Sequence, residues 1–105
     1  MSLVQDSENR SPAYSNTEAR VAFRQAVLGG SMIVTKHARA RMRECGLDNT
    51  DLLQLSRQGA VVTPPEPDIK TGDWVYRIET QHVIAAFVII PQRKVRLVTC
   101  FTPES

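Results

Sequence analysis

The chain has 105 residues and a net charge of +2, with 42% hydrophobic and 23% charged residues. This length gives room for one hydrophobic core and the composition is that of a folded domain, which excludes a two-domain or wholly disordered chain. The longest apolar run, residues 83–90, is far shorter than the roughly 20 residues of a membrane helix. The only cysteines are Cys45 and Cys100, and they do not form a Cys-x-x-Cys motif. We therefore expect free thiols and a cytoplasmic protein with no membrane association.

The first fifteen residues are polar and show no periodicity. We therefore expect a flexible tail over residues 1–15 and a single domain over residues 16–105. Ser15 and Glu18 have the spacing of a capping box, in which each side chain accepts a hydrogen bond from the other residue's backbone. The pattern predicts a first helix over residues 16–28, ended by two glycines.

Two further helices are predicted by their capping residues. Thr35 can cap a helix that runs through Cys45 and stops at Gly46. Asp48 can cap another that closes at Gly59. Because only a short connection separates them, we expect these two helices to pack as a tight hairpin.

Beyond the helices the apolar pattern changes to that of strands. A short β-rich run at residues 32–34 comes before the second helix, and after the third we expect strands over residues 60–63, 74–79, 82–90 and 95–101. In the last of these, Val95, Leu97, Thr99 and Phe101 alternate with Arg96, Val98 and Cys100. The predicted fold class is α+β, with N-terminal helices packed on a C-terminal curved antiparallel sheet of about four strands.

The second predicted helix carries most of the candidate chemistry. His37 and Arg41 lie one turn apart on one face, and Arg39 and Arg43 form a basic pair beside Lys36. An imidazole next to a guanidinium can bind phosphate and transfer protons, which suits phosphodiester chemistry. The alternative is a solvated basic face with a packed or capping histidine.

Other candidates come from the predicted strands. Arg77 could point a guanidinium from the sheet toward the same place, or be a cross-strand partner of Glu79. Trp74 falls on the opposite strand face and is interpreted, with Tyr76, as core. The histidines and cysteines lack the spacing of zinc ligands, so we expect no metal site.

The run Thr35-x-His37-Ala38-x-x-Arg41-Met42-x-Glu44-x-Gly46-Leu47 resembles the opening motif of small bacterial domains catalogued as domain of unknown function 4258. The likeness extends over most of residues 32–101. It implies a fold similar to the RelE and ParE toxins, whose sheet face holds RNA or a partner. By this resemblance the positions of interest are His37, Arg41, Arg77 and Thr99.

The leading hypothesis is a toxin-like domain that interacts with RNA. Its catalytic form is a metal-independent endoribonuclease that needs no cofactor. In that mechanism His37 is the general base or acid, and Arg41 and Arg77 stabilise the charge of the phosphorane. Lys36, Arg39 and Arg43 bind the RNA strand. The alternative is a non-catalytic module that binds an antitoxin-like protein through the basic helix and a sheet edge. Oligomeric state is not indicated by the sequence.

Overall fold

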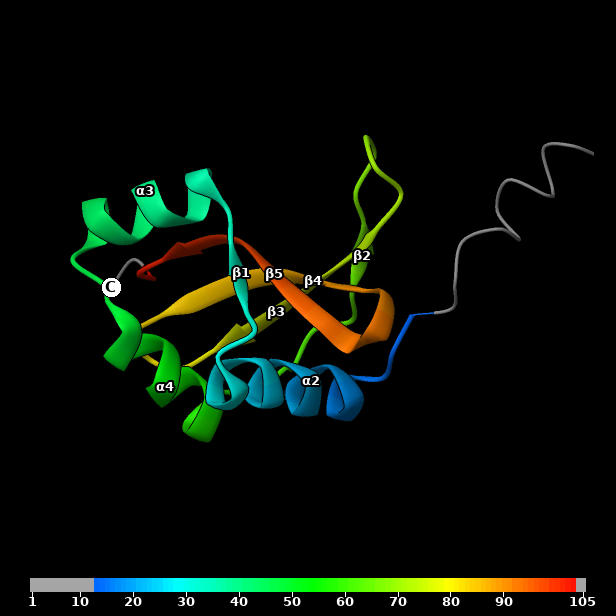
Figure 1. Ribbon diagram of the computed structural model, residues 1–105, viewed down its shortest axis with the longest axis horizontal. Helices are drawn as coiled ribbons and strands as arrows, with labels where there is room; N and C mark the ends of the chain where they lie inside the picture. Colours follow the sequence, from blue (N-terminus) through cyan, green and yellow to red (C-terminus); the bar gives the residue numbers. More distant parts are fainter. Residues whose placement is uncertain (1–12, 104–105) are drawn as a thin grey trace, which may run out of the picture.

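The computed structural model describes residues 13–103, which form three helices and a five-stranded sheet (Figure 1). In chain order the elements are α2 (Asn16–Gly29), β1 (Ile33–Val34), α3 (Lys36–Cys45), α4 (Asn49–Gln58), β2 (Glu66–Pro67), β3 (Trp74–Glu79), β4 (Ile84–Ile90), a 3-10 turn (Pro91–Arg93) and β5 (Lys94–Phe101). The predicted α+β class is confirmed. Residues 1–12 of the predicted tail lie outside the described residues.

The three helices begin at the predicted capping residues. The Ser15 side chain accepts a hydrogen bond from the backbone of Glu18, and the Glu18 carboxylate accepts one from the backbone of Ser15. Thr35 and Asp48 cap α3 and α4 in the same way through their side-chain oxygens. Since each cap satisfies backbone N–H groups that have no partner inside the helix, these starts depend on local sequence alone.

The sheet differs from the prediction in strand number and direction. Its order is β1-β5-β4-β3-β2, and β1 pairs in parallel with β5, so the sheet is mixed. The strand expected over residues 60–63 is not formed; Ala60 makes only a single bridge to Glu79, and Glu66–Pro67 pairs with β3 instead. The β-rich run expected at residues 32–34 does form β1, but its parallel pairing and the strand β2 were not predicted, because two-residue edge strands carry almost no periodic signal.

The expected hairpin of the second and third helices is also wrong. Among the described elements α4 packs on α2, whereas α3 packs on β5. Figure 1 shows α2 and α4 along one side of the sheet and α3 apart from them, beside β5. Thr35 attaches α3 there, because its backbone N–H and its hydroxyl donate to the carbonyls of Leu97 and Val98.

One core cluster joins the buried residues of all three helices to one face of the sheet. At its centre the ring of Phe87 lies 5.0 Å from that of Phe23 and 5.7 Å from that of Tyr76, measured between centroids. The Tyr76 hydroxyl accepts a hydrogen bond of 2.7 Å from the backbone N–H of Tyr14, and its burial raises the pKa of the phenol. This cluster is where the apolar area that stabilises the fold is buried.

No helix in the described part of the chain is both long enough and apolar enough to span a membrane.

Candidate functional site

The sheet has a second face that the helices leave uncovered, which we call the open face. On β3, Tyr76 and Ile78 point into the core, so Val75, Arg77 and Glu79 point to the other side, because successive strand residues alternate. The separation of Arg77 from the aromatic residues of its strand is thus confirmed. Ala86 and Val88 of β4 also lie on the open face; both are buried, yet neither belongs to the core cluster.

A β-bulge decides which residues of β5 reach the open face. Ala86 pairs with Thr99 but Phe87 pairs with Leu97, so Val98 is an extra residue. The extra residue reverses the alternation that the sequence suggested. Val95 and Leu97, before the bulge, are buried in the core as alternation suggests, but after the bulge Cys100 is the residue buried there. The other face of the strand carries Lys94, Arg96, Thr99 and Phe101.

Two rows of paired residues form the centre of the open face. The first row is Arg77, Ala86 and Thr99, and the second is Val75, Val88 and Arg96. The two outer strands lie about 10 Å apart across β4, at two strand spacings. Two arginines from different strands thus flank a strip of two small apolar residues, Ala86 and Val88.

The two arginines differ in their partners. The exposed Arg77 guanidinium has neither a hydrogen bond nor an ion pair with the described side chains. It borders a hollow of about 320 Å³ lined by Thr63, Pro64, Glu66, Val75, Arg77 and Ala86. Arg96 approaches Asp73 at 3.6 Å, with both side chains more than a third exposed. Such a pair contributes only about 0–1 kcal/mol, so Arg96 can exchange this partner for a bound anion at small cost.

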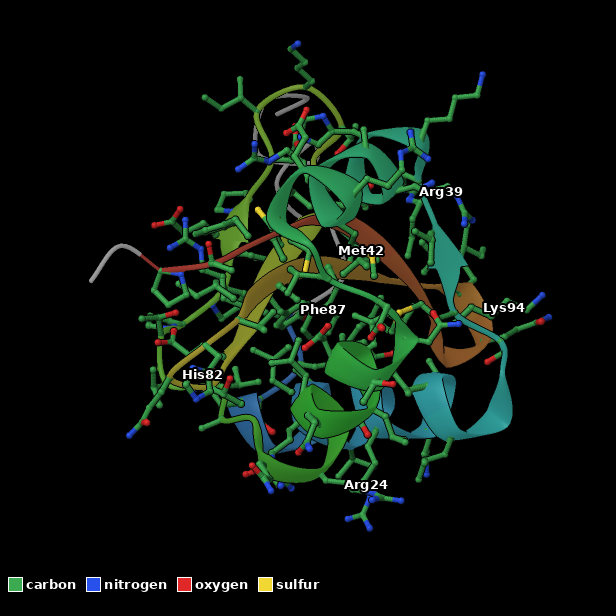
Figure 2. The ribbon with its side chains drawn as sticks, turned by 90° about the vertical axis from the view of Figure 1, so that its left-hand side faces the viewer. Arg24, Arg39, Met42, His82, Phe87 and Lys94 are labelled. Carbon is green, nitrogen blue, oxygen red and sulfur yellow. The ribbon has the colours of Figure 1, made fainter. Side chains whose placement is uncertain are left out.

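The candidate residues of α3 lie on its solvent-facing surface. His37 is exposed, as are Lys36, Arg39 and Arg43. Figure 2 shows Arg39 extending outward from α3, whereas Met42 of the same helix points toward the sheet. Arg41 forms an ion pair of 2.8 Å with Glu44, one turn further along. The positive charge of Arg41 therefore already has a carboxylate beside it.

The four positions taken from the resemblance thus fall into two groups. Arg77 and Thr99 share one row of the open face. His37 and Arg41 lie on α3 and do not line the hollow next to Arg77. The other histidine, His82, is exposed and lies on the far side of the molecule from Arg39 (Figure 2).

Arg96 is the open-face residue that sequence reasoning missed. Its signal was present, since Lys94 and Arg96 alternate with the apolar Val95 and Leu97. What could not be seen was that the bulge places Thr99 on the same face as Arg96.

The two thiols are free, as expected. Burial in the core raises the pKa of the Cys100 thiol to about 11, so the thiol stays protonated at neutral pH and does not act as a nucleophile. In the described part of the chain, no three His, Cys, Asp or Glu side chains gather closely enough to hold a metal ion.

Comparisons of the chain with family models, with curated proteins and with solved structures find no match.

Proposed function

We propose that this protein is an RNA-interacting domain of the RelE and ParE toxin type, which holds the backbone of a single RNA strand on the open face. The observation that carries the proposal is the placement of Arg77 and Arg96 on either side of the Ala86–Val88 strip. Guanidinium groups bind phosphate through paired hydrogen bonds, so two arginines on neighbouring rows can hold successive phosphates of one strand. Thr99 adds a hydroxyl that can pair with a ribose 2′-hydroxyl, the group that distinguishes RNA from DNA.

In this proposal the basic residues of α3 contribute to RNA binding through their charge. Lys36, Arg39 and Arg43 are exposed and have only Glu44 as an acidic neighbour on the helix. Their charges attract the phosphate backbone over a distance set by the ionic strength, about 10 Å at 0.1 M salt. Binding is therefore expected to weaken steeply as salt is added, because counterions are released when the complex forms.

The test is binding of a short single-stranded RNA, followed by fluorescence anisotropy at several salt concentrations. Replacing Arg77 and Arg96 together with alanine should weaken binding and reduce the slope of log K against log salt by about 1.4, at about 0.7 per lost phosphate contact. Arg24→Ala is the matched control, since Arg24 extends from α2 away from the sheet (Figure 2). Asp73→Asn is a second control, because it breaks the ion pair of Arg96 without removing the cation.

Two results would refute this proposal. One is the absence of binding by the unaltered protein at low salt. The other is an equal loss of affinity in the Arg24→Ala control, which would show that only net charge matters.

Strand cleavage is the catalytic form of the same proposal. His37 would take the proton from a ribose 2′-hydroxyl, the oxygen would attack the adjacent phosphorus in line, and the P–O5′ bond would break as the 5′-oxygen takes a proton from water. Arg41, one turn from His37 on α3, would leave its ion pair with Glu44 and stabilise the charge of the phosphorane, while Arg77 on the open face would hold the strand. Incubation with mixed RNA at low salt without added metal should then yield ends with a cyclic phosphate, and His37→Ala should abolish them. Intact RNA with both proteins would limit the function to binding.

A protein-interaction module is the second candidate, and an apolar groove favours it. The groove has a volume of about 380 Å³ and lies between α2, β1 and α4, lined by Ala26, Val27, Gly30, Met32, Val34, Asn49, Leu52 and Leu53. β1 is also an edge strand, so its outer backbone groups can pair with an added strand. An antitoxin-like partner encoded by a neighbouring gene should bind the unaltered protein and the Arg77→Ala variant, and Leu53→Glu should abolish binding without unfolding the domain.

A further inference from the structure

The aromatic residues are distributed unevenly between the two faces of the sheet. The chain has six aromatic residues. Phe23, Tyr76 and Phe87 are buried in the core cluster, and Tyr14 and Trp74 are partly buried against it. Figure 2 shows Phe87 in the interior, between the sheet and the helices. Phe101 is the one aromatic side chain among residues 13–103 that does not belong to this cluster.

The bulge in β5 accounts for the position of Phe101. Phe101 pairs with Ile84 of β4, and Ile84 pairs with Glu79 of β3, so this row lies next to the row of Arg77 and Thr99. Phe101 and Ile84 are both half-buried. Without the extra residue Val98, Phe101 would point into the core. The fold thus places one partly exposed aromatic ring beside the proposed phosphate site.

We infer that Phe101 is a stacking surface for one nucleobase of the strand bound on the open face. This inference rests on the proposed function. Rows on one strand are about 7 Å apart, at two residues per row, so a ribose at Thr99 and a base at Phe101 can belong to one nucleotide. An aromatic ring stacks on any base through its π-face, so the position accepts one unpaired nucleotide with little preference for its identity. The other five rings are committed to the core, so the phosphate contacts supply the remainder of the affinity.

The experiment compares two strands of equal length, a single-stranded oligoadenylate and a chain of abasic ribose phosphates. The unaltered protein should bind the oligoadenylate at least about fivefold more tightly, the lower end of what one stacked base contributes. Phe101→Leu should bring this ratio close to one and leave the salt dependence unchanged, because the phosphate contacts remain. Phe101→Tyr is the matched control and should keep the ratio, since it retains the ring.

The outcomes separate this inference from the proposed function. Failure of the unaltered protein to bind either strand would refute the proposed function. Equal binding of the two strands, or a ratio that persists in Phe101→Leu, would overturn only the stacking of a base on Phe101. Thermal unfolding of each variant checks that the fold is retained. If Phe101→Leu does not fold, the same contact is tested by the fluorescence of 2-aminopurine placed in the strand. Binding to the unaltered protein and to Phe101→Tyr should quench this fluorescence, and unchanged fluorescence would overturn the inference.

Discussion

Replacing Gly59 with alanine should strongly destabilise the protein, and the reason is steric. Gly59 ends α4 with φ −70° and ψ 154°, a conformation that any residue can adopt. A Cβ atom there would lie 2.5 Å from the carbonyl oxygen of Leu55 and 2.7 Å from Cγ1 of Ile78. Ordinary carbon contacts are about 3.5–4.0 Å, so the added methyl group would overlap its neighbours by about 1 Å.

Neither neighbour of Gly59 can move away easily. Ile78 is fully buried on β3, and the Leu55 carbonyl accepts the Gly59 N–H at 2.8 Å. The Gly59 carbonyl in turn accepts a hydrogen bond of 2.8 Å from Nε of Arg20 on α2. Relief would require α4 to shift away from β3, so we expect a loss of about 3 kcal/mol in the free energy of unfolding, the upper part of the usual range for overpacking.

This loss corresponds to a fall in Tm of about 10–20 °C, measurable by circular dichroism during heating and by urea titration. Gly29→Ala is the control, because a Cβ atom at the end of α2 would meet nothing within 4 Å. That change should be neutral or stabilise by up to about 1 kcal/mol. If Gly59→Ala is as stable as the unaltered protein, the predicted clash of the added methyl group with Leu55 and Ile78 is refuted.

Four further predictions concern the core, the two thiols and the first helix. Tyr76→Phe removes the hydrogen bond from Tyr14 and should lower the free energy of unfolding by about 1 kcal/mol in urea titration; no change would mean that water replaces the bond. Because burial raises the pKa of Cys100 to about 11, its proton is held more tightly in the folded state. Unfolding should therefore become easier as pH rises from about 9 toward 11, and a Cys100→Ala variant should show a smaller dependence. Below pH 9, iodoacetamide should modify Cys45 before Cys100, as peptide mass spectrometry would report; the reverse order would contradict the burial of Cys100. Ser15→Ala breaks the capping box of α2 and should lower Tm through a loss of about 1 kcal/mol, whereas an unchanged Tm would show that packing alone holds the helix start.

The helices were predictable because their limits are set within a few residues. Ser15, Thr35 and Asp48 each accept hydrogen bonds from N–H groups two or three positions ahead. Gly30 and Gly46 end two helices at positive φ, where glycine is favoured. These interactions are read directly from sequence spacing. The strand of residues 74–79 was predicted with its observed bounds for a similar reason, since its alternation is regular.

The sequence by itself therefore determined the α+β class, the three helices and the basic character of α3. The tertiary structure decided which candidates share a surface. The bulge at Val98 turned Thr99 and Phe101 away from the core side that alternation suggested, to the face that already carries Arg77 and Arg96. The same structure left His37 and Arg41 on α3, apart from the hollow beside Arg77. The physical reason is that a cap depends on neighbours in the chain, whereas strand register and the face of a side chain depend on pairing between residues far apart in sequence.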